Sequence, residues 1–430
     1  MNRKKIIFKN VSLGVLYKAL NLIIVFTTIP ILLNYLEKEQ YGVWVTVFSL
    51  VNIVLFVDGG LGNGLKTKLS EALSLKNTQL AKTYISTAYV SISIISFIVL
   101  IIGCSLIYLI DLKSLLNTNL SEKLLKTVFF STLVLVVFGF VLNLYKSFYY
   151  AAQKSSKVEL SLLIYQVLIL FSVTVLLQYF PRNLLFVALT YGLSNIIVTI
   201  VFTVSFFKKN KELQPSITFF SKEKVKDLMG LSLPFFCIQL CMIIIFTTDN
   251  LIIANYIGPA EVANYDIVYK LFQVVVTFSV ILQDPLWALY TDAFQKKDFK
   301  WIKGTLKRLN KLFLLLIFFI IGLFFVSKPL IKFWLQKELN ISNNLLLFMA
   351  VFVVVRVYGI IFMNFLNSIG KVKIQMWLYV FGAIINIPLS ILFVTSFNLG
   401  STGVIVGTII SIISLSLILP IQTYQILKNK

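Results

Sequence analysis

The chain has 430 residues, of which 58% are hydrophobic and only 13% are charged, and its formal net charge is +22. A soluble protein of this length could not bury so much apolar side chain, because a large part of any folded surface faces water. The composition excludes a soluble globular protein and predicts an all-α integral membrane protein, since apolar runs of about 20 residues suit spanning helices better than barrel strands.

Twelve apolar stretches are long enough to cross a bilayer. The longest stretch between them, at residues 208–230, is basic and contains Pro215. We expect it to be a cytoplasmic linker between an N-terminal six-helix lobe at 1–207 and a C-terminal six-helix lobe at 231–430. The predicted spans are 11–34, 41–59, 83–108, 126–148, 158–180, 183–207, 231–257, 262–289, 309–327, 343–368, 375–397 and 402–425.

A pattern in the first lobe returns in the second. Residues 24–58 end one apolar helix, make a charged turn and open a second helix, and residues 244–284 repeat this arrangement about half the chain later. Such a repeat favours two homologous halves. Because each half has an even number of spans, we expect parallel repeats around a central cavity. The recurring landmarks are Phe26-Thr27-Thr28 and Phe246-Thr247-Thr248, Asn34-Tyr35 and Asn255-Tyr256, Tyr41 and Tyr265, and Asp58 and Asp284.

Lysine and arginine are concentrated on alternate connecting stretches. Most of them lie before span one and after spans two, four, six, eight, ten and twelve. By the positive-inside rule these stretches face the cytoplasm, so both termini are predicted to be cytoplasmic. The basic residues flank the membrane without forming a continuous patch, which favours contact with membrane lipids and argues against nucleic-acid binding.

The residue types that usually hold metals are scarce. No histidine is present, and Cys104, Cys237 and Cys241 lie in apolar runs without metal-binding spacing. Histidine-ligated metals and histidine general bases are therefore excluded, and the cysteines are interpreted as small buried hydrophobic residues. We expect no metal and no cofactor.

Span eight carries polar side chains along one face. Asp266, Lys270, Gln273 and Thr277 have offsets that place them, with the span-end Asp284, close to one line on a helix. Such a stripe avoids lipid, because a charge at the bilayer centre costs at least about 2.5–3.5 kcal/mol. Two interpretations stay open: the stripe lines a transport cavity, or it is a buried seam in which Asp266 and Lys270 form a local i,i+4 pair.

Other charged residues lie inside spans one, seven and ten. Lys18 and Arg356, together with Lys270, form a candidate cationic binding site for an anionic substrate, and a guanidinium suits a phosphate. The alternatives are that Lys18 reaches back to the cytoplasmic interface and that Arg356 neutralises a structural carboxylate. Asp249 is a candidate proton or sodium site, or else the partner of Arg356 or Lys270.

Asp58 and Asp284 occupy equivalent places in the two halves, at the predicted cytoplasmic ends of spans two and eight. We expect both carboxylates to hold an inner gate by pairing with nearby lysines. The alternative is that both are simply solvated at the membrane interface.

Two short motifs resemble those of a known family. Tyr41-Gly42-Val43-Trp44 follows the first turn, and Asp58-Gly59-Gly60-Leu61-Gly62-Asn63-Gly64 closes span two. With twelve spans in two lobes, they resemble the polysaccharide-transporter family, the Wzx-type O-antigen and capsule flippases of the multidrug/oligosaccharidyl-lipid/polysaccharide exporter superfamily. The resemblance implies a MATE-like fold and alternating access. It also implies translocation of an undecaprenyl-pyrophosphate-linked oligosaccharide across the bacterial inner membrane, coupled to an H⁺ or Na⁺ gradient.

Two other functions stay open. A multidrug or cation antiporter of the same superfamily would favour acidic and aromatic cavity residues, whereas the candidate site here is cationic or balanced. A membrane-embedded polysaccharide polymerase or ligase would need a large external loop with catalytic residues, and the external loops here are short. A flippase is not an enzyme. Its expected partners are the lipid-linked oligosaccharide, a polysaccharide polymerase and a chain-length regulator.

Overall fold

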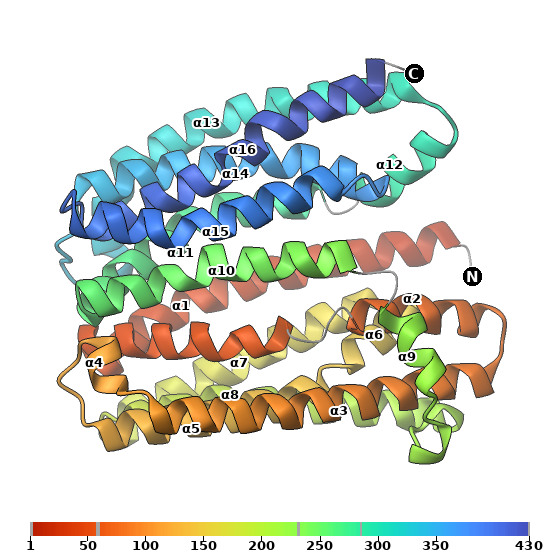
Figure 1. Ribbon diagram of the computed structural model, residues 1–430, viewed down its shortest axis with the longest axis horizontal. Helices are drawn as coiled ribbons and strands as arrows, with labels where there is room; N and C mark the ends of the chain where they lie inside the picture. Colours follow the sequence, from red (N-terminus) through yellow and green to blue (C-terminus); the bar gives the residue numbers. More distant parts are fainter. Residues whose placement is uncertain (1–2, 57–60, 230–232, 284–285, 429–430) are drawn as a thin grey trace. The chain divides into compact units, whose positions relative to one another are not determined.

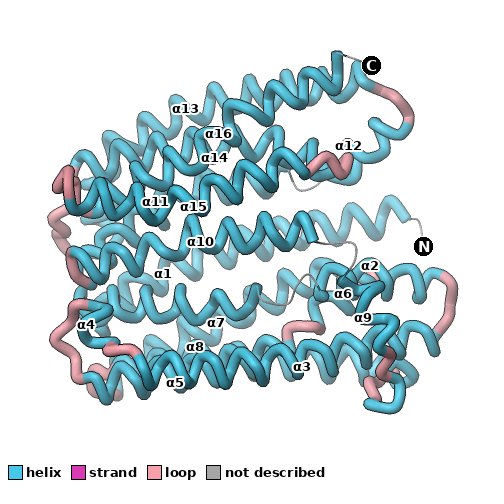
Figure 2. The backbone as a smooth tube through the Cα atoms, viewed as in Figure 1, coloured by secondary structure: helices cyan, strands magenta, loops and turns pink. Residues whose placement is uncertain are grey.

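The computed structural model describes residues 3–56, 61–229, 233–283 and 286–428, and the regular elements in these ranges are all helices (Figure 1, Figure 2). Within the described residues, 11 helical segments are long and apolar enough to cross a membrane. The first of them, Ser12–Asn52, covers most of two predicted spans, 11–34 and 41–59. The prediction of an all-helical membrane protein is therefore confirmed, with eleven to twelve spanning helices.

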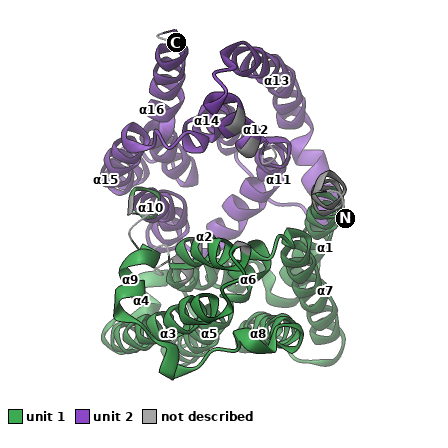
Figure 3. Ribbon diagram, turned by 90° about the vertical axis from the view of Figure 1, so that its right-hand side faces the viewer, with its two compact units in different colours: residues 1–236 green, residues 237–430 purple. Residues whose placement is uncertain are grey.

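The chain divides into two compact units, Met1–Phe236 and Cys237–Lys430, which Figure 3 colours green and purple. Unit 1 contains α1 (Arg3–Asn52), the 3-10 helix η1 (Ile53–Phe56), α2 (Leu61–Ser74), α3 (Thr78–Leu109), α4 (Leu112–Leu116), α5 (Glu122–Leu142), α6 (Tyr145–Ala151), α7 (Ser155–Tyr179), α8 (Leu184–Lys209), η2 (Lys211–Leu213), η3 (Ile217–Phe219) and α9 (Lys222–Met229). Unit 2 contains most of α10 (Leu233–Tyr256), followed by α11 (Pro259–Gln283), α12 (Leu286–Gln295), α13 (Phe299–Leu335), α14 (Asn343–Ser368), α15 (Lys373–Thr395) and α16 (Ser401–Lys428).

The charged turn predicted after the first span is a sharp break inside α1. Glu37 has a φ of 62° and a ψ of 175°, so the helix stops and restarts there. The carboxylate of Glu37 forms an ion pair with Arg182. Two residues earlier, the Tyr35 hydroxyl donates to the Pro181 carbonyl at 2.6 Å. The turn between the first two spans is therefore tied to the connection between α7 and α8.

The same turn is also tied to a second connection of unit 1. Glu39 Oε1 accepts a hydrogen bond from Thr118 Oγ1 at 2.7 Å and another from the backbone N–H of Asn119 at 3.1 Å. Hydrogen bonds to an ionised acceptor are stronger than those between neutral groups. The α4–α5 connection, the α7–α8 connection and the turn in α1 are thus held together by side chains of the turn.

Side-chain caps set where several spanning helices begin. The side chains of Asn77, Ser121 and Asn183 accept hydrogen bonds from backbone N–H groups in the first turns of α3, α5 and α8. Asp298 and Ser342 do the same for α13 and α14. The first N–H groups of a helix have no partner within it, so these residues satisfy donors that the connecting loops would otherwise leave unpaired.

Large apolar side chains project outward from the long helices. Phe97 of α3 is 64% exposed, and Phe318 and Phe325 of α13 are each 73% exposed. Water would make such surfaces costly, whereas hydrocarbon solvates them, and the backbone groups of a helix are satisfied internally. The outer faces of these helices therefore suit a lipid environment.

Residues 211–229, which we call the connector, pack on unit 1. They cover α2 and the first turns of α3 and lie within the predicted linker at 208–230, whose cytoplasmic position stays a prediction. The Lys224 ammonium, 3.0 Å from Asp227, holds the pKa of that carboxyl below its usual value. The contacts to α3 are Ser216 N–H to Ser86 Oγ at 3.1 Å, Ser221 N–H to Thr87 Oγ1 at 3.1 Å, the Tyr84 hydroxyl to Asp227 Oδ2 at 3.3 Å, and the Lys82 ammonium 4.5 Å from the Phe219 ring centroid.

Gly64, the last residue of the motif that resembles the polysaccharide transporters, is where α2 meets the connector. A Cβ at this position would collide with the backbone carbonyl of Leu228 in α9. A backbone atom cannot rotate away, so Gly64→Ala is expected to displace α9 at a cost of about 1–3 kcal/mol. Thermal unfolding of the purified protein should show a midpoint lowered by a few degrees, and limited proteolysis should cut the connector faster.

Gly322→Ala is the matched control for this substitution. Gly322 is likewise a helical glycine, in α13, but no described atom outside its own helix stands within 4 Å of the place its Cβ would occupy. Alanine is favoured over glycine in a helix, so this variant should be at least as stable as the parent protein. Equal stability of both variants would show that α9 does not press on Gly64.

Candidate functional site

Helix α11 carries the polar stripe predicted for span eight. Lys270 Nζ lies 2.7 Å from Asp266 Oδ2, one helical turn earlier, and Asp266 is only 7% exposed. The local i,i+4 pair, one of the two interpretations of the stripe, is therefore present. Gln273 and Thr277, further along α11, line a cavity inside unit 2. The structure thus divides the stripe into an ion pair and a cavity-lining part.

Arg356 of α14 faces the same part of α11. Its Nη1 donates to the Tyr269 hydroxyl at 3.0 Å and to Gln273 Oε1 at 3.2 Å. The guanidinium carbon lies 4.4 Å from the ring centroid of Phe246 and 5.6 Å from that of Phe352, which is cation–π geometry. Across the described residues, no carboxylate lies within ion-pair distance of Arg356. Its charge is held in place by neutral groups and is not neutralised.

The cavity beside Arg356 has a volume of about 360 Å³. Its walls come from α10, α11, α14, α15 and α16, and are mainly apolar. The polar groups among them are few, as in most small-molecule sites, and the volume falls in the usual range of about 300–1,000 Å³. These polar groups belong to Gln273, Thr277, Arg356, Tyr379 and Ser416.

Asp249 of α10 is buried, with 3% of its surface exposed. Tyr265 of α11 donates its hydroxyl to Asp249 Oδ2 at 2.7 Å, and Thr408 of α16 donates to the carboxylate at 3.1 Å. Thr408 in turn accepts from Asn386 Nδ2 of α15 at 3.2 Å. In the described part of unit 2, the contacts of Asp249 are therefore with hydroxyl groups and not with the two basic residues considered as its partners.

The remaining predicted site residues lie elsewhere. Lys18 belongs to unit 1, where its Nζ lies 3.9 Å from Glu159 Oε1 of α7, a carboxylate that the sequence did not single out. Asp58 and Asp284, the predicted gate residues, fall outside the described residues. Of the three predicted cations, Lys18 and Lys270 each have a carboxylate nearby, and Arg356 does not.

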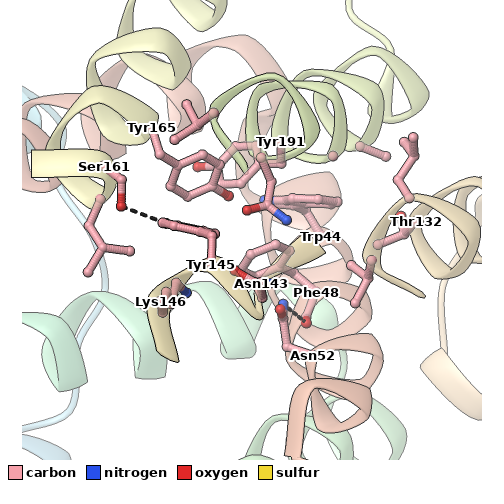
Figure 4. Close-up of a pocket in the computed structure, with 17 residues that line it drawn as sticks. Trp44, Phe48, Asn52, Thr132, Asn143, Tyr145, Lys146, Ser161, Tyr165 and Tyr191 are labelled. Carbon is pink, nitrogen blue, oxygen red and sulfur yellow. Dashed lines mark hydrogen bonds between the residues drawn. The ribbon is translucent and has the colours of Figure 1, made fainter. Parts of the chain in front are cut away.

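The sequence did not predict a cavity of about 170 Å³ inside unit 1 (Figure 4). Its lining comes from α1, α5, α6, α7 and α8 and from Asn143 between α5 and α6. The sequence features that could have indicated this cavity are the uncharged polar residues within apolar spans and Lys146, which lies among aromatic residues. The polar lining residues include Asn52, Asn143, Lys146, Tyr165 and Asn195.

Several polar residues of unit 2 were also missed. Tyr269 positions Arg356, and Tyr265, Asn386 and Thr408 surround Asp249. All four are uncharged residues in spanning helices. Sequence reasoning considered the cost of burying charges but gave less weight to hydroxyl and amide groups, which also need partners in an apolar environment.

The sequence and the fold can now be compared with those of known proteins. The family model described as "Polysaccharide biosynthesis protein" matches residues 7–283, which is more than half of the chain. The chain belongs to the polysaccharide biosynthesis protein family. A second model, described as "MatE", matches residues 234–392 of this polysaccharide biosynthesis protein. The predicted family resemblance is therefore confirmed.

Relatives in enteric bacteria are distant but extend over most of the chain. A "Putative O-antigen transporter" of Salmonella typhimurium is 25% identical over 89% of this chain and 88% of its own length. A "Putative O-antigen export protein" of Yersinia pseudotuberculosis is 24% identical over 92% of this chain and 90% of its own. About nine-tenths of the polysaccharide biosynthesis protein therefore aligns with these relatives.

A solved structure supports the fold. The inward-facing conformation of a multidrug resistance MATE family transporter of the MOP superfamily matches with a TM-score of 0.80 at 13% identity, covering 97% of this chain and 98% of that one. At this identity the likeness shows the fold, and the expected MATE-like architecture is confirmed. The family and the fold are those of membrane transporters, so the polysaccharide biosynthesis protein is not an enzyme.

Proposed function

We propose that this transporter moves an undecaprenyl-pyrophosphate-linked oligosaccharide, the repeat unit of an O-antigen or capsule, across the bacterial inner membrane by alternating access. Membership of the polysaccharide biosynthesis protein family supports the proposal, as do the O-antigen relatives that align over most of the chain. The observation that carries it is the Arg356 guanidinium, which lines a cavity and has no carboxylate partner among the described residues.

A pyrophosphate needs such a group on its way through a membrane. An isolated anion in hydrocarbon costs tens of kcal/mol by ideal solvation estimates, and a fixed cation in a polar cavity removes much of that cost. The hydrogen bonds of Arg356 to protein groups use Nη1, so Nε and Nη2 have no partner among the described residues. These two nitrogens present the parallel N–H donors that bind phosphate oxygens in a bidentate way.

Lys18 and Lys270 keep a smaller role in this proposal. Each lies close to a carboxylate, Glu159 and Asp266 respectively, so its charge is partly balanced before any substrate arrives. A balanced lysine binds an anion less tightly, which favours release after translocation. We therefore assign the main phosphate contact to Arg356. The inner gate formed by Asp58 and Asp284 stays a prediction, as do a polymerase and a chain-length regulator as partners.

We also propose that Asp249 takes up the coupling cation, H⁺ or Na⁺. A buried carboxylate in contact with the hydroxyl oxygens of Tyr265 and Thr408 offers the hard oxygen ligands that such a cation prefers, and it can also accept a proton. The surrounding groups come from α11, α15 and α16, so occupancy of Asp249 bears on the packing of four helices of unit 2.

Deletion of the gene in its own bacterium tests the transport function. We expect loss of surface polysaccharide and accumulation of the lipid-linked repeat unit at the cytoplasmic face, with both restored by the gene on a plasmid. Unchanged polysaccharide together with raised sensitivity to cationic drugs would contradict this function and support a multidrug antiporter.

The predicted orientation gives a separate test. In a variant with Cys104, Cys237 and Cys241 replaced, single cysteines at Lys113 and Lys332 should react with a membrane-impermeant thiol reagent in intact spheroplasts, because the positive-inside rule places them outside. Cysteines at exposed Lys222 and Lys300 should react only after the membrane is opened. Labelling of Lys222→Cys in intact spheroplasts would reverse the orientation.

A further inference from the structure

The cavity inside unit 1 is walled on one side by packed aromatic rings. The ring centroids of Trp44 and Phe48 of α1 lie 5.1 Å apart, and the Tyr191 ring of α8 lies 5.0 Å from the first and 5.3 Å from the second (Figure 4). Aromatic rings at these distances and in tilted or edge-to-face orientations attract one another. An apolar wall with a few polar groups nearby is the usual surface for a ring that has both C–H faces and hydroxyl edges.

Amide groups provide the polar part of the lining. Asn143, between α5 and α6, lines the cavity, and its Oδ1 is buried without a hydrogen-bond partner. A buried acceptor without a donor is unfavourable, so this atom favours a ligand that brings an O–H group. Asn52 and Asn195 lie in the same lining, and each amide both donates and accepts. This combination matches a polyhydroxyl compound better than an apolar drug.

A lysine gives the cavity a positive charge. Lys146 of α6 is among the lining residues, and in the described part of unit 1 no carboxylate lies within ion-pair distance of its ammonium. Glu159 lies 3.9 Å from Lys18 and acts on Lys146 through its charge without contacting it. A half-buried ammonium with no carboxylate in direct contact favours an anionic ligand, to which it can donate up to three hydrogen bonds.

The size of the cavity limits what it can hold. Its volume of about 170 Å³ is below the range of about 300–1,000 Å³ for pockets that enclose a drug-sized molecule. It exceeds by several times the roughly 30 Å³ that one water molecule occupies in the liquid. A single six-membered ring fits this volume, whereas a whole oligosaccharide does not.

We propose that this cavity binds one sugar ring that carries a carboxylate, a uronic-acid-type unit. The ring's C–H face packs against the aromatic wall of Trp44, Phe48 and Tyr191, a hydroxyl donates to Asn143, and Lys146 pairs with the carboxylate. The proposal rests on the proposed function in one respect, since the sugar belongs to the transported head group. The site itself depends only on residues of unit 1.

Titration of the purified full-length protein with three small probes tests the site. In a variant in which Trp287, Trp301, Trp334 and Trp377 are replaced by Phe, Trp44 is the single tryptophan and reports on the cavity. We expect saturable quenching by glucuronate in the millimolar range, and at least about tenfold weaker binding of glucose and of inorganic phosphate. Thermal shifts of the unaltered protein with the same three probes provide a second measurement that needs no tryptophan replacement.

Lys146→Met keeps the length of the side chain and removes the charge. It should weaken glucuronate binding at least about tenfold and leave the weak glucose binding unchanged. Lys154→Met is the matched control, because Lys154 is exposed, lies eight residues later and is not among the lining residues. This control should bind glucuronate as the parent protein does.

Three results would overturn the proposal: no binding of glucuronate, equal binding of glucuronate and glucose, or phosphate binding as strong as that of glucuronate. Binding that Lys146→Met leaves unchanged would also overturn it. Sugar binding needs no translocation, so the two proposals fail separately. If the protein binds glucuronate but deletion of its gene leaves surface polysaccharide intact, the transport function alone is contradicted. If the gene restores surface polysaccharide but the purified protein does not bind glucuronate, the sugar site alone is contradicted.

Discussion

Arg356→Ala is expected to abolish polysaccharide export while the protein still inserts in the membrane. Removing one partner of a buried, hydrogen-bonded charge pair costs about 2–5 kcal/mol, which corresponds to a loss of roughly thirtyfold or more. In the parent protein the two partners of this pair are Arg356 and the pyrophosphate of the bound substrate. Surface polysaccharide in the complemented deletion strain, measured at matched protein levels, gives the readout.

Two further variants make this result specific. Arg356→Lys should keep part of the activity, because the charge survives although the bidentate donors do not. Arg308→Ala removes an exposed arginine of α13 in the same unit and should export normally. Since Arg356→Ala also leaves Tyr269 and Gln273 without a bond to the guanidinium, its unfolding midpoint should be compared with that of the parent protein. Full export by a stable Arg356→Ala protein would make the residue structural.

Asp249→Asn should separate transport from the ion gradient. The substitution keeps the size of the side chain but removes the carboxylate that accepts hydrogen bonds from Tyr265 and Thr408. In proteoliposomes with lipid-linked oligosaccharide as substrate, an imposed H⁺ or Na⁺ gradient should accelerate translocation by the parent protein. The Asp249→Asn protein should show the same slow rate with and without the gradient.

Asp266→Asn is the matched control for this experiment. Both residues are buried aspartates of unit 2, with 3% and 7% of their surfaces exposed, and the same carboxylate-to-amide change is made in both. Asp266 faces Lys270 directly, so its variant should change the binding of an anion rather than the response to a gradient. If Asp249→Asn still responds to the gradient, or if Asp266→Asn loses the response equally, Asp249 is not the coupling site.

The spans were predictable because a bilayer imposes one simple requirement, a long apolar helix. Span ends were less predictable, since they depend on local contacts. Span two was predicted to reach residue 59, but α1 ends at Asn52 and continues as the 3-10 helix η1. The short helices α2 and α12 were not predicted either. Each is too short to span, and its position depends on packing against distant helices, as the contact of Gly64 with Leu228 illustrates.

The site was predictable only where one helix determines it. Helical periodicity placed Asp266, Lys270, Gln273 and Thr277 on one face of span eight, and the structure has Arg356 bonded to the third of these. The surroundings of Asp249 could not be read from the sequence, because Thr408 lies 159 positions away. Contacts over such distances arise from tertiary packing, which leaves no periodic trace in a single sequence.

The break in α1 also limits how unit 1 can vary between related proteins. Tyr35, Glu37 and Glu39 join three connections that lie far apart in sequence. An insertion or deletion in any one of them would pull apart hydrogen bonds that belong to the other two. We therefore expect the lengths of these three connections to be kept or changed together among related proteins.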